Sequence, residues 1–320
     1  MDEIDLSSLQ DGCGLFLRSG VTITALTGED RTRYLNGLVT CQVDGLEPGQ
    51  GAYGFFTDNK GHILSDVVVR ALDDRFWLEL PNDASAGISE QLRKYIVADR
   101  IEVSPDLEIA ALTVVGAGSR AAVEGLVGPL DWIGSEWGHG QAELFGESIR
   151  ICVDERLGLP AMTIWAPKAA APEVAWKILE SLPSGSGIVT DRSVDIARIG
   201  AGIARFGSDF GPDNLPQETA IESAVDYEKG CYLGQEVVAR LHYRGQVSRA
   251  LRSIRFASDE PLTIGSKLLF DNRESGSVTS GALLPGSQGA VGIAMIDRRA
   301  FEIGTLLQDE QGGAVEVIEV

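Results

Sequence analysis

Residues 229–236 read Lys-Gly-Cys-Tyr-Leu-Gly-Gln-Glu and place a thiol, a cation and two glycines side by side. Apolar residues recur at helical spacing after this stretch, which predicts a helix over residues 235–243 with Cys231 at its mouth. The free amides of a helix N-terminus and the charge of Lys229 would both favour a thiolate, so Cys231 is a candidate reactive thiol. A lone cysteine is also commonly a small, buried, inert side chain, and the sequence leaves that alternative open.

The composition predicts a globular chain with more than one domain. It has 320 residues, 44% of them hydrophobic, and this length suggests two or three domains. The acidic start Met-Asp-Glu-Ile-Asp lacks the basic region of a secretory signal, and no apolar run approaches the roughly 18 residues that span a bilayer. We therefore expect a cytoplasmic protein without a membrane partner.

Cysteine and histidine spacing indicates neither disulfides nor a metal site. The four cysteines form no CxxC pair, and the chain has only three histidines. The cysteines are Cys13, Cys41, Cys152 and Cys231.

The net charge of −20 argues against direct contact with nucleic acid or anionic membranes over most of the surface. One segment, residues 229–255, departs from this balance with six basic residues against a single acidic one, Glu236. A local basic tract in an acidic protein is typical of a site for an anionic ligand. The alternative is that its arginines pair with the surplus carboxylates across domain contacts.

The first third of the chain alternates short strand patterns with amphipathic helix patterns. Glycine-containing turns separate them, which indicates α+β packing with helices on one face of antiparallel sheets. We expect strands at 14–18, 21–26, 52–56, 63–69 and 75–80, and helices at 28–39 and from 82 or 83 to about 96. The first two strands flank Ser19-Gly20, which predicts a hairpin.

Asp66 stands inside the valine-rich strand pattern at 63–69. A carboxylate there must find a partner, face a cavity or point to solvent. Asp66 is therefore a second candidate site residue.

The middle of the chain repeats the order of the first part. Residues 23–38 and 111–126 match at an offset that aligns Gly28 with Gly116 and Gly37 with Gly125, so we infer two related α+β halves. We expect a long loop at 129–148. The further strands and helices expected here are strands at 108–115, 149–153 and 161–165, and helices ending at 126, beginning near Pro172 and covering 194–199.

Beyond Arg249 the pattern changes to short strands without helices, at 251–256, 267–270, 277–283, 290–295, 305–308 and 314–320. Such regular spacing predicts a small antiparallel β-barrel. The predicted domains are residues 1–110, 111–245 and 246–320, of which the first two can exchange segments.

The motif at 229–236 resembles the signature of the folate-binding YgfZ family, relatives of the glycine-cleavage T-protein (aminomethyltransferase). The likeness extends from about residue 12 to the C-terminus. Supporting patches are Leu35-Asn36-Gly37-Leu38, Asn59-Lys60-Gly61-His62-Ile63-Leu64, the approach at 207–218 and Arg244-Gly245.

The resemblance implies two ferredoxin-like halves and a β-barrel arranged as a three-domain ring, with tetrahydrofolate in a central cavity. It also implies a role in assembling or maintaining iron–sulfur clusters, including those of tRNA-modifying enzymes. The implied partners are folate and iron–sulfur enzymes or assembly proteins.

Two departures from the family pattern concern carboxylates. Aminomethyltransferases typically carry adjacent aspartates where this chain has Ser65-Asp66, and they and many YgfZ relatives have a glutamate where this chain has Gly200. In the family the glutamate contacts the pterin, whose amide and amino edge pairs well with a carboxylate, so its loss removes a charge-assisted pair commonly worth about 1.5 to 3 kcal/mol.

The leading interpretation is a tetrahydrofolate-binding accessory protein of iron–sulfur metabolism; the alternative is a folate-dependent one-carbon transferase. Catalytic roles are expected for Cys231 and Asp66. In the alternative, Asp66 would position or deprotonate the folate amine. Gln235 and Glu236 are expected to hold the loop through backbone amides. The expected cofactor-binding residues are Asp66, Lys229, Cys231, Tyr232, Gln235, Arg240 and Arg249, the two arginines serving the glutamate tail of folate or an acidic partner.

Overall fold

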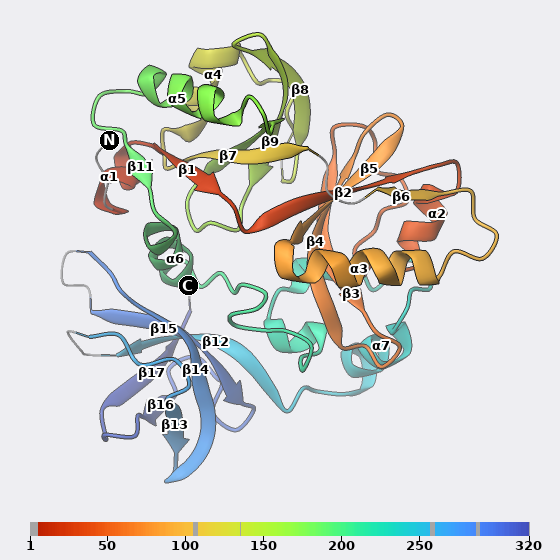
Figure 1. Ribbon diagram of the computed structural model, residues 1–320. Coiled ribbons are helices and arrows are strands. Elements are labelled where there is room, and N and C mark those ends of the chain that lie inside the picture. Colours follow the sequence, from red (N-terminus) through yellow and green to blue (C-terminus); the bar gives the residue numbers. More distant parts are fainter. Residues whose placement is uncertain (1–5, 105–107, 135, 257–259, 286–288, 320) are drawn as a thin grey trace. The chain divides into compact units, whose positions relative to one another are not determined.

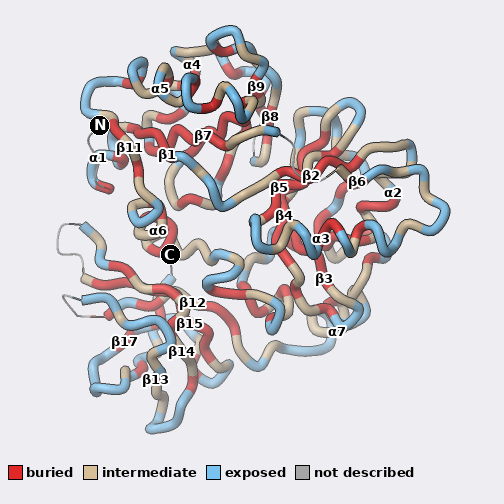
Figure 2. Tube along the Cα trace, in the orientation of Figure 1, coloured by how far each residue is buried: buried red, intermediate tan, exposed pale blue. Residues whose placement is uncertain are grey.

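The computed structural model describes residues 6–104, 108–134, 136–256, 260–285 and 289–319 (Figure 1). Two compact units share the chain. The first comprises Met1–Glu155, Leu159–Thr190 and Ser223–Gln235, and the second comprises Arg156–Gly158, Asp191–Glu222 and Glu236–Val320. In Figure 2 the buried residues follow the strands, while exposed residues gather on loops and on the outward sides of helices.

A five-stranded antiparallel sheet of the first unit has the order β3-β4-β5-β2-β6. Its helix-facing side is apolar, because alternate strand residues such as Val67 and Val69 point toward α2 and α3 and pack with Leu35, Ile88 and Leu92. The elements are β2 (Val21–Thr27), α2 (Arg31–Asn36), β3 (Gly51–Thr57), β4 (Ile63–Ala71), β5 (Arg75–Pro81), α3 (Asn82–Lys94) and β6 (Glu102–Ser104).

A six-stranded sheet, also in the first unit, has the order β11-β1-β7-β10-β9-β8. Val123 of α4 and Val174 and Ile178 of α5 pack with the apolar strand residues. The elements are α1 (Leu6–Asp11), β1 (Gly14–Arg18), β7 (Ile109–Val115), α4 (Ser119–Val127), β8 (His139–Leu144), β9 (Glu147–Asp154), β10 (Ala161–Pro167), α5 (Ala171–Ser181) and β11 (Ile188–Val189).

The second unit contains a closed barrel of order β12-β15-β14-β13-β16-β17 around an apolar core. Its strands are β12 (Arg249–Phe256), β13 (Lys267–Phe270), β14 (Arg273–Leu283), β15 (Ala290–Asp297), β16 (Leu306–Gln308) and β17 (Ala314–Ile318). The helices outside the barrel are α6 (Asp191–Gly200), η1 (Pro216–Thr219), η2 (Glu222–Ala224) and α7 (Gln235–Arg244); η2 and α7 cross between the units.

The α+β class with helix-covered sheets and a C-terminal antiparallel barrel is confirmed. The predicted barrel strands are all present, although Val320 lies outside the described residues. The ring arrangement and the three domain boundaries stay predictions.

Three local predictions were wrong. The strands at 14–18 and 21–26 form no hairpin: β1 pairs with β7 and β11, whereas β2 pairs with β5 and β6 of the other sheet. The expected loop at 129–148 contains β8, which pairs with β9 over its whole length. The helix expected at 28–39 is only Arg31–Asn36, because Gly28 has φ 107° and is not helical.

Candidate functional site

Residues 229–234 form a loop that ends where α7 begins, and the one cation of this loop, Lys229, points inward. Lys229 is buried, and its Nζ donates to the carbonyl oxygen of Val39 at 2.8 Å and to that of Cys41. The same Nζ lies 5.5 Å from the ring centre of Tyr232, within the range of a cation–π contact. Burial lowers the pKa of Lys229 to about 8 and raises that of the Tyr232 phenol. Lys229 thus anchors the loop to the first unit.

The far side of the loop is also fixed. The Leu233 amide donates to the Gly37 carbonyl at 3.0 Å, and the Leu233 carbonyl accepts from the Thr57 hydroxyl. Gly234 has φ 85° and lies so close to the backbone of Asp58 and Gly61 that a side chain would overlap them. Segments at 35–38 and 59–64, quoted above as family-like, therefore neighbour the signature in space.

Cys231 lies between these two anchors and is exposed. The buried alternative left open by the sequence is wrong. The other three cysteines are buried, and burial raises their thiol pKa values, to about 11 for Cys41 and for Cys152. Cys231 is thus the one exposed residue among the four cysteines.

Asp66 lies on the face of the five-stranded sheet that points away from α2 and α3. It is buried, and its Oδ2 accepts from the Tyr53 hydroxyl at 3.1 Å. The Tyr53 ring in turn stacks on the Trp137 ring with centres 5.5 Å apart and planes 18° apart. Asp66 therefore has a partner, and an aromatic pair stands beside the carboxylate. Its neighbour Ser65 donates to the Asp66 carbonyl at 2.7 Å, so Ser65 does not replace the missing carboxylate.

Trp137 and Arg70 are site neighbours that the sequence analysis missed. Trp137 has φ 58°, a rare conformation for a bulky residue, and its carbonyl accepts from Arg70 Nη1 at 2.9 Å. Arg70 is fully buried and also pairs with Glu79 at 3.4 Å. The available signal was an arginine directly after the valine-rich run that contains Asp66.

The Gly200 position is occupied by an apolar neighbour. A Cβ at Gly200 would lie 2.9 Å from Leu284 Cδ2, and Leu284 packs with Ile199, Ala282 and Val291. A longer side chain at this position would have to shift the end of the Leu284 side chain.

The two arginines expected to bind anions differ. Arg249 forms an ion pair with Glu218, Nε to Oε1 at 3.2 Å, and donates to the Asp213 carbonyl at 2.9 Å, as the pairing alternative predicts. Arg240 is exposed on α7. Gln235 begins α7, and its amide donates to the Tyr232 carbonyl at 3.1 Å.

Comparison with known proteins identifies the family of this chain. The family profile described as "GCVT N-terminal domain" matches residues 3–229. The chain belongs to this family.

Within the described residues, no group of three or more His, Cys, Asp or Glu side chains could hold a metal ion. The same residues contain no helix that is long and apolar enough to cross a membrane.

Relatives of this GCVT-domain chain carry two kinds of name. The tRNA-modifying protein YgfZ of Sodalis glossinidius (strain morsitans) is 26% identical over 305 residues, covering 92% of this chain and 88% of that protein. The YgfZ protein of Serratia proteamaculans (strain 568) is 28% identical, with coverages of 82% and 78%. An aminomethyltransferase of Caldanaerobacter subterraneus subsp. tengcongensis is 23% identical, with coverages of 94% and 81%.

A crystal structure shows that the GCVT-family fold extends over nearly the whole chain. The glycine cleavage system aminomethyltransferase T of Bartonella henselae superposes with a TM-score of 0.88 at 22% identity, covering 98% of this chain and 87% of that one. The resemblance to YgfZ proteins and aminomethyltransferases is thereby confirmed, and at this identity the structural match establishes the fold.

Proposed function

We propose that this chain is a cytoplasmic, tetrahydrofolate-binding accessory protein that supports the assembly or maintenance of iron–sulfur clusters, including those of tRNA-modifying enzymes. The exposed thiol of Cys231, in a loop fixed by Lys229 on one side and by Leu233 and Gly234 on the other, carries this proposal. A thiol presented on an anchored loop suits transient ligation of a cluster or a mixed disulfide with a partner. The YgfZ names of the relatives support the same direction.

Asp66 and its aromatic neighbours support folate as the ligand. A pterin presents an amide and amino edge, which pairs with a carboxylate, and a flat ring system, which packs on aromatic side chains. Asp66 supplies the carboxylate, and Tyr53 and Trp137 supply the stacked rings. Exposed Arg240 is the candidate for the glutamate tail or an acidic partner, whereas Arg249 is held by Glu218.

A second candidate function is one-carbon transfer to tetrahydrofolate. The buried carboxylate of Asp66 favours it, because such a group could position or deprotonate the folate amine. Two features weigh against it: Ser65 uses its hydroxyl on the backbone, and Leu284 fills the place next to Gly200. The accessory role therefore remains the preferred proposal.

The test replaces the thiol and measures cluster-dependent activity in cells lacking the native protein. Cys231→Ser changes an exposed position, so we expect the free energy of unfolding to stay within about 0.5 kcal/mol of the wild type. We expect the activity of a client iron–sulfur enzyme to fall about tenfold, since a hydroxyl is a far poorer nucleophile and metal ligand than a thiolate. Glu228→Gln, at an exposed position in the same loop, is the matched control and should complement fully.

Full complementation by Cys231→Ser would contradict thiol chemistry.

A second experiment tests folate binding. Asp66→Asn should weaken tetrahydrofolate binding about 10- to 100-fold in calorimetry, because the variant loses one charge-assisted hydrogen bond. Turnover of about 1 per second or faster with tetrahydrofolate and an aminomethyl donor would instead establish the transferase. No heat and no thermal shift with tetrahydrofolate would contradict both folate functions.

A further inference from the structure

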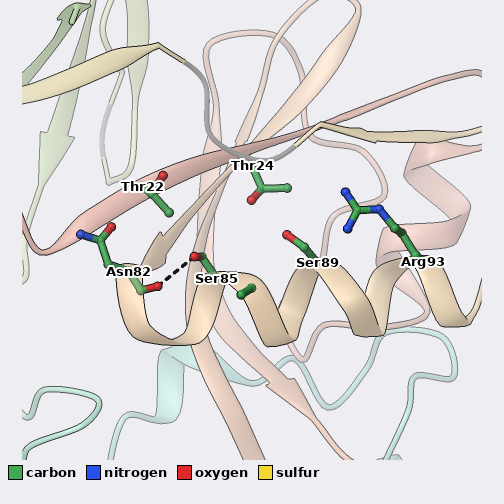
Figure 3. A pocket seen from close by; sticks show the side chains of 7 residues that line it. Thr22, Thr24, Asn82, Ser85, Ser89 and Arg93 are labelled. Atoms are coloured by element: carbon green, nitrogen blue, oxygen red, sulfur yellow. Dashed lines mark hydrogen bonds between the residues drawn. The ribbon is translucent and has the colours of Figure 1, made fainter.

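The first unit contains a pocket of about 490 Å³ between strand β2 and helix α3, shown in Figure 3. Six polar side chains and one small apolar one line it. They are Thr22, Thr24, Asn82, Ser85, Ala86, Ser89 and Arg93.

Two sequence periodicities place these polar groups opposite one another. Alternation along β2 turns Thr22 and Thr24 toward the helix. Positions 82, 85, 89 and 93 recur on one side of α3 at intervals of three and four residues. A strand and a helix ordinarily pack through apolar side chains, as α3 does through Ile88 and Leu92. Here the facing groups are polar and, apart from Arg93, short, and a cavity remains.

Two hydroxyls of the pocket lack the partners that buried polar groups normally have. Thr24 and Ser89 are 0% and 2% exposed, and neither Thr24 Oγ1 nor Ser89 Oγ makes a hydrogen bond. In Figure 3 both hydroxyls point into the space between strand and helix. Buried hydroxyls without partners are costly in a folded protein, and a polar molecule bound in the pocket would remove that cost by bonding to them.

Ser85 and Arg93 make only part of the hydrogen bonds that their side chains are capable of. Ser85 donates to the Asn82 carbonyl at 2.9 Å, which leaves its oxygen as an acceptor. Arg93 is exposed, and its Nη2 donates to the Val103 carbonyl at 3.3 Å; a guanidinium has five N–H donors, and this bond uses one. The lining contains no carboxylate, so the pocket has a positive charge although the chain as a whole has −20.

We propose that this pocket binds a small, hydroxylated phosphate monoester. The phosphate lies at Arg93, because guanidinium groups bind phosphate oxygens through parallel N–H donors. The hydroxyl groups of the ligand face Thr24 and Ser89. Ser89 is one helical turn from Arg93, about 6 Å along the axis, a separation that suits a phosphate and a hydroxyl of one small molecule. The site is independent of Cys231 and Asp66.

Calorimetric titration of the full chain with ribose 5-phosphate tests the proposal, with inorganic phosphate and ribose as comparison ligands. We expect ribose 5-phosphate to bind at least about tenfold more tightly than either comparison ligand, since only it engages both ends of the pocket. Equal affinity for inorganic phosphate would overturn the hydroxyl contacts, and equal affinity for ribose would overturn the phosphate contact. No binding of ribose 5-phosphate would overturn the proposal.

Matched variants locate the site. Arg93→Gln should weaken ribose 5-phosphate about tenfold or more, whereas Lys94→Gln, which removes the same charge from the next, exposed position outside the pocket, should leave affinity unchanged. Equal effects of the two variants would show non-specific attraction and overturn the site.

Substitutions at two buried positions distinguish a role in ligand binding from a role in packing alone. Thr24→Val and Ser89→Ala each remove an unsatisfied hydroxyl, so we expect a higher melting temperature together with weaker ribose 5-phosphate binding. Higher stability with unchanged affinity would show that the hydroxyls are only a packing defect. If these variants do not fold, the exposed Arg93→Gln and Lys94→Gln pair still decides the proposal.

Discussion

The ammonium group of Lys229 is held inside the first unit by the carbonyl oxygens of Val39 and Cys41 and by the ring of Tyr232. A buried cation is tolerated only where dipoles replace its hydration, and these carbonyls do so in part. Burial nevertheless lowers the pKa of Lys229 from its ordinary 10.5 to about 8. The lysine thus fixes the loop that presents Cys231, and its charge depends on pH in the mildly alkaline range.

The titration of Lys229 predicts a pH-dependent stability. Between pH 8 and 10.5 the unfolded chain holds this proton more tightly than the folded chain, so its contribution to the free energy of unfolding rises with pH across that window. Urea denaturation measures the free energy of unfolding of wild type and of Lys229→Met. The wild-type value minus the variant value should increase by about 2 kcal/mol from pH 7.5 to 9.5. The same difference for Lys60→Met, at an exposed position, should stay constant. A flat or falling difference for Lys229→Met would show that the ammonium is not desolvated.

Two glycines at equivalent places join strand to helix in both halves of the first unit. Gly28 follows β2 with φ 107°, and Gly116 follows β7 with φ 121°. A side chain at either position would overlap a neighbouring backbone, that of Arg100 at Gly28 and that of Gly12 at Gly116. The internal match in the sequence thus aligns two positions that both need glycine because a side chain would overlap a neighbouring backbone. This shared requirement supports the inference of related halves.

A pair of alanine substitutions in the second of these halves tests that steric reason. Gly116→Ala should lower the free energy of unfolding by about 2 kcal/mol or more, because it combines a left-handed φ with backbone overlap. Gly125→Ala, inside α4 with open space around it, should instead raise it by about 0.5 to 1 kcal/mol. Chemical denaturation measures both. Similar values for the two variants would contradict the close approach at Gly116.

At the scale of the whole molecule, 47 acidic residues stand against 27 basic ones. Part of the basic segment at 229–255 is committed internally: Lys229 to carbonyls, Arg249 to Glu218, and Arg252 to the Phe301 carbonyl at 2.9 Å. This distribution favours protein or small-molecule partners over a polyanion. If the proposed function holds, the chain acts on tRNA-modifying enzymes and not on the tRNA.

We therefore predict no direct tRNA binding. In filter binding at about 0.15 M salt, the dissociation constant for unmodified tRNA should exceed about 100 µM, which is the weak limit of ordinary non-specific binding to nucleic acid. A basic polypeptide retained by the same tRNA is the positive control. Micromolar retention that falls steeply with salt would identify a basic face and contradict this prediction.

Much of the fold could be predicted from the sequence because strands, helices and turns have local causes. The alternation at 63–69, the helical spacing after Gly234 and the short strands beyond Arg249 each report burial and backbone preference within a few residues. The signature at 229–236 indicated the family by the same kind of local information. By contrast, β8 was not predicted, because this strand is defined by its pairing with β9 and not by the residue pattern of its own segment.

The sequence alone therefore determined most element types, the C-terminal barrel and the family, and it named Cys231 and Asp66 as candidate site residues. Only the tertiary structure decided that Cys231 is exposed, that Lys229 turns inward, that Asp66 meets Tyr53 and Trp137, and that a polar pocket separates β2 from α3. The physical reason is separation along the chain. Lys229 and Val39 are 190 residues apart, and a contact that folding closes over such a distance leaves no trace in local periodicity.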